Sequence, residues 1–154
     1  FYFDGSDVGL TSDSEDVDAI IVNASGQLLI STTAGVSVSG ASGVHADLLI
    51  FTPTSLGSVT AGTWAMYFDG SDVGFGSSGT EDLDAAALSF AGALVLSTIG
   101  DFNVPGLLGP NEDAIQFNAT TLGDVTVGTF VPLLDLSALG IDPGENLGGL
   151  EFVP

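Results

Sequence analysis

The sequence predicts an all-β protein that contains two tandem four-stranded repeats and a partial third copy. Three observations support this prediction. Residues 2–10 read YFDGSDVGL and return at 67–75 as YFDGSDVGF. The apolar segments are short and are bounded by Gly, Asn, Asp, Ser and Pro, as β-strands usually are. No window of about 11 residues shows the apolar spacing of an amphipathic helix.

The repeat covers almost the whole chain. After the first block the offset changes from 65 to 66 residues, and EDVDA at 15–19 returns as EDLDA at 81–85. A degenerate third copy begins with LLD at 133–135, in the place of YFD at 67–69. We therefore expect one β-repeat at 1–65, a second at 66–130, and a partial third at 131–154 that supplies pairing or capping strands.

Each full repeat has four segments with the composition of strands. In repeats 1 and 2 these are 1–3 and 64–68, 19–22 and 85–90, 27–31 and 93–97, and 47–51 and 113–117. NASG at 23–26 predicts a hairpin turn between the second and third strands. The fourth segment is apolar almost throughout, which predicts burial on both faces. The pattern leaves open whether the units form blades, a sandwich or a stacked array.

The blocks FDGSDVGL, EDVDA and LLISTT together resemble tandem repeats of secreted bacterial surface proteins. The resemblance implies an exported, repetitive surface protein with units like propeller blades. A closed propeller needs about 4 to 8 blades, so two units would have to associate with further copies or stack as an open array. The chain starts at Phe1 rather than Met, which we interpret as a processed or excised segment.

The charge of the chain excludes several classes of protein. Its 154 residues include 20 acidic side chains, no Lys or Arg and a single histidine, which gives a net charge of -20. Without cations the chain lacks the residues that neutralise nucleic-acid phosphates. No apolar run approaches the ~20 residues that span a bilayer. We therefore expect neither nucleic-acid binding nor membrane insertion. The absence of cysteine also excludes disulfides and thiolate metal sites.

The carboxylates concentrate in short windows of each repeat. Such crowding costs free energy unless a cation neutralises it, and calcium prefers carboxylate and carbonyl oxygens as ligands. We therefore expect calcium binding by these groups. The candidate ligands are Asp4, Asp7, Glu15, Asp16 and Asp18 in repeat 1, Asp69, Asp72, Glu81, Asp82 and Asp84 in repeat 2, and Asp47 and Asp113 at the start of the fourth strands. The alternative is a set of solvated acidic turns closed by Asx hydrogen bonds.

The third copy separates the acidic role from the strand-forming role. It keeps Asp135 but has Ala138, Asn146 and Gly148 where repeat 2 has Asp72, Asp82 and Asp84. Its apolar strand positions persist as Leu133, Leu134, Leu150 and Phe152. The three replaced acids and their counterparts in repeat 1 are therefore the preferred ligands.

We do not expect an enzyme. The acidic groups recur in both repeats, whereas an active site is usually unique, and no apolar pocket is evident around them. The single histidine, His45, has Asn111 at its matching position, and we expect it to be a loop residue. We expect Trp64 to be a core aromatic rather than a sugar-stacking residue.

The leading hypothesis is an extracellular structural protein that self-assembles through β-strand edges into a filament or other surface polymer of its own copies. The alternative is a non-enzymatic carbohydrate- or surface-binding adhesin module.

Overall fold

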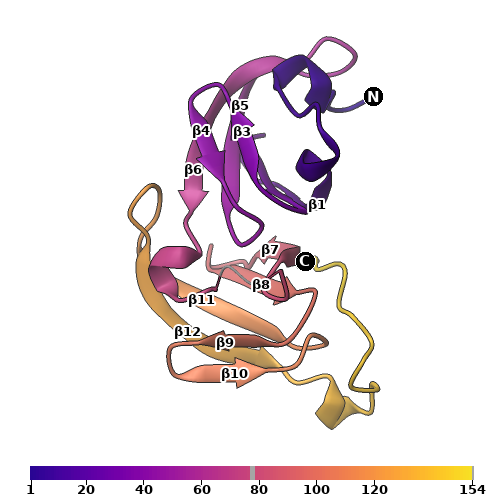
Figure 1. Cartoon of the computed structure of the whole chain (residues 1–154), viewed down its shortest axis with the longest axis vertical. Coiled ribbons are helices and arrows are strands. Elements are labelled where there is room, and N and C mark those ends of the chain that lie inside the picture. The colour runs from indigo at the N-terminus through magenta and orange to yellow at the C-terminus, as the bar shows by residue number, and fades with distance from the viewer. Residues whose placement is uncertain (77–78, 154) are drawn as a thin grey trace.

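The computed structural model describes residues 1–76 and 79–153, and it confirms the all-β prediction. Two similar lobes follow one another along the chain (Figure 1). Each lobe contains one antiparallel four-stranded sheet and one two-stranded hairpin. Among the described residues, no helix is long and apolar enough to cross a membrane.

The sheets have the same strand order in both repeats. In repeat 1 the order is β1 (Val17–Val22), β2 (Leu28–Thr32), β5 (Leu48–Ser55) and β6 (Ala61–Phe68). In repeat 2 it is β7 (Leu83–Leu88), β8 (Leu94–Thr98), β11 (Ala114–Thr121) and β12 (Val127–Leu134). The hairpins are β3 (Val36–Val38) with β4 (Ala41–Gly43), and β9 (Phe102–Val104) with β10 (Leu107–Gly109). Short 3-10 turns are η1 (Gly5–Val8), η2 (Asp13–Glu15), η3 (Ser71–Val73) and η4 (Ser137–Leu139).

The predicted turn at 23–26 is confirmed. The backbone N–H of Asn23 donates to the carbonyl of Gln27, and its side-chain oxygen accepts from the N–H groups of Ser25 and Gln27. Gly26 adopts a φ of 76°, a left-handed conformation that favours glycine. The turn therefore sets the register of β1 against β2.

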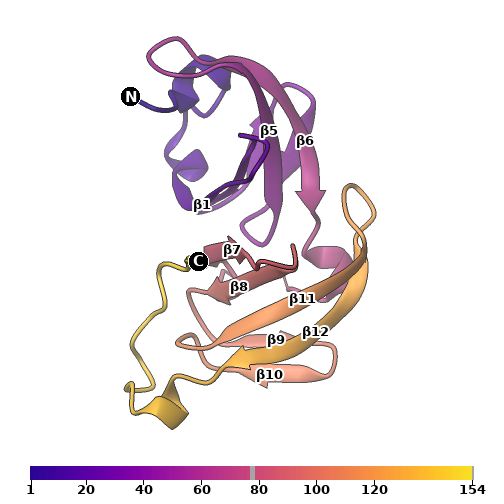
Figure 2. The same cartoon turned by 180° about the vertical axis from the view of Figure 1, so that it is seen from behind.

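The predicted strand at 1–3 is wrong. These residues have no ladder partner and lie against the β5–β6 turn of their own repeat, where the Gly57 N–H donates to the Tyr2 carbonyl at 2.9 Å. The Gly123 N–H donates to the Tyr67 carbonyl at the same distance in repeat 2. Tyr67 is also part of β6, which belongs to the sheet of repeat 1 and runs on into repeat 2 (Figure 2). The predicted boundaries at 65/66 and 130/131 thus fall inside β6 and β12.

The partial third copy forms no named strand within the described residues 135–153. Leu150 and Phe152, expected at strand positions, lie in irregular backbone beside β7. The reason is visible in the sequence: Gly148 and Gly149 replace two residues of β7, and glycines weaken a strand because they have no side chain to pack. We call residues 135–153 the C-terminal segment.

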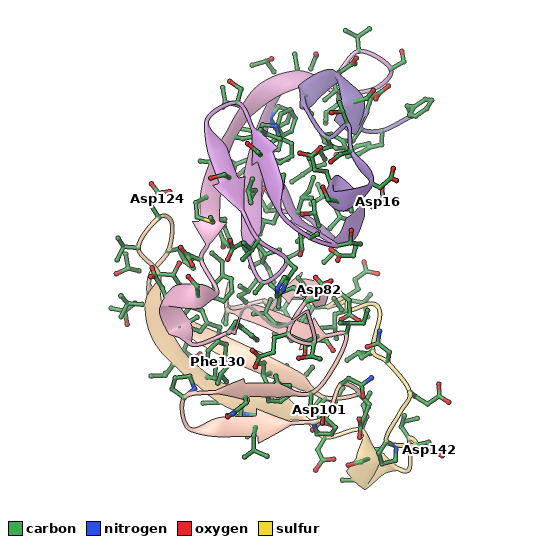
Figure 3. All side chains as sticks on the ribbon, viewed as in Figure 1. Asp16, Asp82, Asp101, Asp124, Phe130 and Asp142 are labelled. Carbon is green, nitrogen blue, oxygen red and sulfur yellow. The ribbon has the colours of Figure 1, made fainter. Side chains whose placement is uncertain are left out.

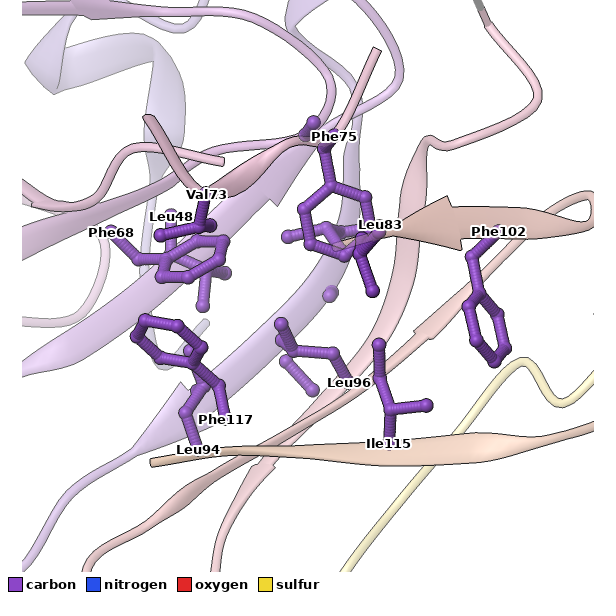
Figure 4. Close-up of a cluster of buried hydrophobic side chains, with 14 residues drawn as sticks. Leu48, Phe68, Val73, Phe75, Leu83, Leu94, Leu96, Phe102, Ile115 and Phe117 are labelled. Atoms are coloured by element: carbon purple, nitrogen blue, oxygen red, sulfur yellow. The ribbon is translucent and has the colours of Figure 1, made fainter. Parts of the chain in front are cut away.

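Each sheet packs one face under its own hairpin and 3-10 turn. In repeat 1 this core contains Leu28, Ile30, Phe51 and Trp64. The core of repeat 2 also includes Phe68 from the end of β6 (Figure 4). The aromatic pairs repeat closely, because the ring centroids of Phe51 and Trp64 lie 4.8 Å apart and those of their counterparts, Phe117 and Phe130, 4.9 Å apart. The two repeats therefore share one packing scheme.

Candidate functional site

The aspartates of the DGSD motif hold local structure in both repeats. Asp4 accepts from the N–H and hydroxyl of Ser6 at the start of η1, and Asp69 does the same for Ser71. The second aspartate accepts from the turn between the last two strands. The Thr60 N–H donates to Asp7 at 2.9 Å, and the Thr126 N–H donates to Asp72 at 2.9 Å. These bonds tie the 3-10 turns to the sheets.

Glu15 and Glu81 connect the loop before the first strand to the hairpin. Glu15 accepts from the N–H groups of Thr11 and Ser12 and from that of Ser37 in β3. Its hydrogen bonds, led by that from Thr11, lower the pKa of Glu15 to about 2. Glu81 likewise accepts from the N–H of Asn103 in β9 at 2.7 Å and from the N–H of Gly76. Both glutamates therefore have a structural role in the described fold.

Asp47 and Asp113 occupy the ends of the repeats that face the next copy. One carboxylate oxygen of Asp47 accepts from the Val44 N–H at 2.8 Å, and the other accepts from the Gly70 N–H of repeat 2 at 2.9 Å. Asp113 accepts from the N–H of Leu136, in the C-terminal segment, at 3.1 Å. Each of these acids thus reaches across a junction.

Asp18 and Asp84 are bulge residues. Val17 pairs with Thr32 and Ala19 pairs with Ser31, so Asp18 is the extra residue between them. The same shift occurs in β7, where Asp84 is the extra residue. A bulge re-aims the side chain of the inserted residue. Here it places one carboxylate of each repeat at the edge facing the next copy.

Asp82 meets Asp18 across the junction between the repeats. Figure 3 places Asp82 between the two lobes, and its carboxyl group lies close enough to that of Asp18 for the two to interact. Asp82 is 7% exposed. Burial, followed by the negative charge of Asp18, raises the pKa of Asp82 to about 7. Its counterpart in repeat 1, Asp16, is exposed.

Burial raises the pKa of the other junction carboxyls as well. This holds for Asp18, Asp84, Asp47 and Asp113. One oxygen of Asp82 and one of Asp84 are buried without a hydrogen-bond partner in the described structure. The carboxyl groups whose pKa is raised therefore lie at the junctions, whereas hydrogen bonds lower the pKa of Glu15.

The same contacts recur at the two junctions. In the first, the Leu83 N–H donates to the His45 carbonyl at 3.0 Å. In the second, the Leu147 N–H of the C-terminal segment donates to the Asn111 carbonyl at 3.4 Å. Asp82 meets Asp18 in the first junction. At the matching place in the second junction, the side-chain amide of Asn146 donates to Asp84. These two hydrogen bonds of the second junction, and the one from Leu136 to Asp113, join residues at the positions that correspond to those of the first junction.

We call the donor side of a repeat its head and the acceptor side its tail. The head of repeat 2 comprises Gly70, Asp82, Leu83 and the inner face of β7. The tail of repeat 1 comprises Asp18, His45, Asp47 and the outer face of β1. Ala19 of β1 packs into the core cluster of repeat 2, with Ala46 and Leu48. Although β1 and β7 are close neighbours, they share no ladder of hydrogen bonds.

The structure thus brings Asp82 near Asp18 and Asp84, and Asp47 near Asp69. Among residues 1–76 and 79–153, no three His, Cys, Asp or Glu side chains gather closely enough to hold a metal ion. Calcium binding therefore stays a prediction. The sequence analysis missed Asn146, although its position opposite an aspartate signals an amide–carboxylate pair.

Trp64 is a core residue, as expected. It is 7% exposed, and its indole N–H donates to the Val8 carbonyl at 2.9 Å. His45 lies in a turn, also as expected. Carbohydrate binding stays a prediction without a surface tryptophan to support it.

Comparisons with protein-family models, with curated proteins and with solved structures each found no match.

Proposed function

We propose that this chain is an extracellular structural protein whose repeats associate head to tail into a filament or other surface polymer. The observation that supports the proposal is the recurrence of the junction. The tail of repeat 1 binds the head of repeat 2, and the tail of repeat 2 holds the matching residues of a third copy through the same positions. A contact that can be repeated without closing a ring builds an open array.

The head of repeat 1 carries apolar side chains that no other described residue covers fully. Val17 is 41% exposed, whereas its counterpart Leu83 is fully buried against repeat 1. Ile20 and Val22 of β1 are each 51% exposed. A second copy would cover these apolar side chains as repeat 1 covers β7. The contact is made by packing and by a few hydrogen bonds, so it differs from the strand-edge ladder that we expected.

The extracellular location and the calcium requirement belong to the same proposal. The location depends on the resemblance to secreted repeat proteins. The requirement for calcium depends on the net charge of -20, because like charges on both partners oppose association until cations neutralise them.

Electron microscopy of the purified protein, with millimolar calcium and then with chelator, tests the proposal. We expect regular filaments or other polymers in calcium and their loss in chelator. Dispersed particles in both conditions would exclude self-assembly as the function.

A matched pair of variants tests the surface. Val17→Asp places a charge on the head and should prevent assembly. Val59→Asp changes a more exposed valine, in the β5–β6 turn, and should leave assembly unchanged. Equal behaviour of the two variants would show that the head is not the contact surface.

A further inference from the structure

We infer that the C-terminal segment is an internal cap: it occupies the tail of repeat 2, and the head of repeat 1 from a second copy displaces it. This inference rests on the proposed function and identifies the surface and the partner. The segment runs along the outside of repeat 2 and ends beside β7 (Figures 1 and 2). It therefore lies on the surface that a following repeat would cover.

The cap contacts the same positions of the tail as the head of a repeat does, but it is held there by few contacts. Three hydrogen bonds join it to the tail, from Leu136, Asn146 and Leu147. One aromatic contact adds to these, with the rings of Phe90 and Phe152 5.9 Å apart. Most of the segment is exposed. By contrast, Asp82 and Leu83 are buried at the first junction. A few contacts from an irregular, exposed segment are easily exchanged.

The close approach of the two backbones at a junction favours the head of repeat 1 over the cap. At the first junction Gly70 lies so close to Ala46 that an added Cβ would be 2.3 Å from the Ala46 carbonyl oxygen. The cap has Leu136 at that position, and its N–H reaches the aspartate at 3.1 Å instead of 2.9 Å. Repeat 1 has Gly5 there. The head of a second copy therefore supplies the residue that this close approach requires.

The side-chain volumes in the proposed contact also match those at the first junction. At the first junction the larger Ile21 of the tail lies with the small Ala86 of the head in one packed cluster. In the proposed contact these sizes are exchanged, because the tail of repeat 2 has Ala87 and the head of repeat 1 has Ile20. The combined volume of the two partners is conserved, and volume-conserving exchanges are the ones that packed surfaces tolerate best.

A buried carboxylate under the cap points the same way. Glu112 replaces Ala46 of repeat 1 and is 1% exposed, yet neither of its side-chain oxygens has a hydrogen-bond partner in the described structure. Leaving a buried carboxylate unpaired is unfavourable. The tail of repeat 2 thus contains a buried acidic side chain that no described residue pairs with.

A reversible lock tests the inference in the chain of residues 1–154. The protein has no cysteine, so Phe90→Cys with Phe152→Cys introduces a single pair at two side chains whose rings are in contact. We expect the oxidised or bis-maleimide-linked chain to stay monomeric in sedimentation velocity, and the reduced chain to assemble. The two single-cysteine variants are the controls, and both should assemble.

Loosening the cap is the complementary experiment. Asn146→Ala with Phe152→Ala removes one hydrogen bond and the ring contact, which should lower the concentration for half-maximal assembly about tenfold. An excess of a synthetic peptide of residues 133–153 should raise that concentration. Circular dichroism confirms that the variants are folded.

The outcomes separate the two proposals. If the locked chain assembles as readily as the wild type, and neither the loosened variant nor the peptide changes assembly, the cap is refuted while self-assembly stands. If the wild type and the loosened variant both stay monomeric, self-assembly is refuted and the cap with it.

Discussion

At the scale of single residues, the aspartates of one motif have different roles because they lie in different surroundings. Asp7 accepts a backbone N–H at a turn, whereas Asp82 is buried against another carboxyl group. A proton on Asp82 removes the repulsion between the two carboxylates, which is one reason why the pKa of Asp82 is raised. At the second junction Asn146 donates to Asp84 with an amide, which needs no proton. The two junctions therefore differ in their dependence on pH.

The first prediction concerns this proton. Folding raises the pKa of Asp82 from 3.8 to about 7, so the folded state binds more protons than the unfolded state between these values. The contribution of Asp82 to the free energy of unfolding is therefore complete below about pH 4 and is lost as the pH rises through 7. We expect the wild type to lose on the order of 2 kcal/mol of unfolding free energy between pH 5 and pH 8 through this group.

Asp82→Asn should remove most of that pH dependence, because the amide does not titrate. Asp101→Asn removes the same charge from an exposed site and is the control. Urea unfolding of the three proteins across this pH range is the measurement. The assignment fails if Asp82→Asn and Asp101→Asn have the same slope of stability against pH.

At the scale of elements, composition predicted the long strands and missed the short ones. The predicted segments 19–22, 27–31 and 47–51 all lie in or overlap β1, β2 and β5. The strands of the β3–β4 and β9–β10 hairpins have three residues each, too few for alternation to be recognised. The segment 1–3 was misread because it matches the end of β6, whose pairing depends on residues that precede it.

Glycine sets the distance between β5 and β6. A Cβ on Gly62 would lie 2.4 Å from the Thr52 carbonyl oxygen and 2.5 Å from the Phe51 ring. Gly128 has the same surroundings in repeat 2. The ring of the preceding strand therefore lies directly over these glycines, and this placement brings Phe51 against Trp64.

The second prediction follows from this contact. Gly62→Ala should lower the free energy of unfolding by about 1–3 kcal/mol, because the methyl group overpacks the aromatic core. Gly149→Ala has nothing within 4 Å of the added methyl group and should change stability little. Thermal unfolding measures both. An unchanged melting temperature for Gly62→Ala would mean that β6 can move away without cost.

At the scale of the whole molecule, the repeat could be predicted from sequence identity alone, but the junction could not. The matching of FDGSDVG and EDxDA fixed two similar units. It did not show that Asp47 reaches Gly70, or that Asp18 and Asp82 come from opposite sides of one contact, because such pairs are set by how one repeat packs on the next. Spacing along the chain also does not reveal which backbone N–H groups surround each carboxylate, and calcium binding by these acids stays a prediction.

The third prediction concerns the net charge of -20, which no Lys or Arg offsets. Raising NaCl shortens the screening length from about 10 Å at 0.1 M to about 3 Å at 1 M, so both the melting temperature and the extent of assembly should rise with salt. A melting temperature that falls or stays level over this range would show that repulsion between carboxylates does not limit stability.

The fourth prediction separates calcium binding from this general screening. At matched ionic strength, bound calcium adds RT ln(1 + [Ca]/Kd), which is about 2.7 kcal/mol at a hundredfold excess over Kd. If the carboxylates of the EDVDA block are ligands, millimolar calcium should raise the melting temperature beyond NaCl of equal ionic strength, and Asp16→Asn with Asp18→Asn should reduce that gain. Asp101→Asn with Asp124→Asn changes two exposed acids of repeat 2 and should keep it. Equal curves in calcium and in matched NaCl would instead mean that hydrogen bonds and screening alone hold the carboxylates in place.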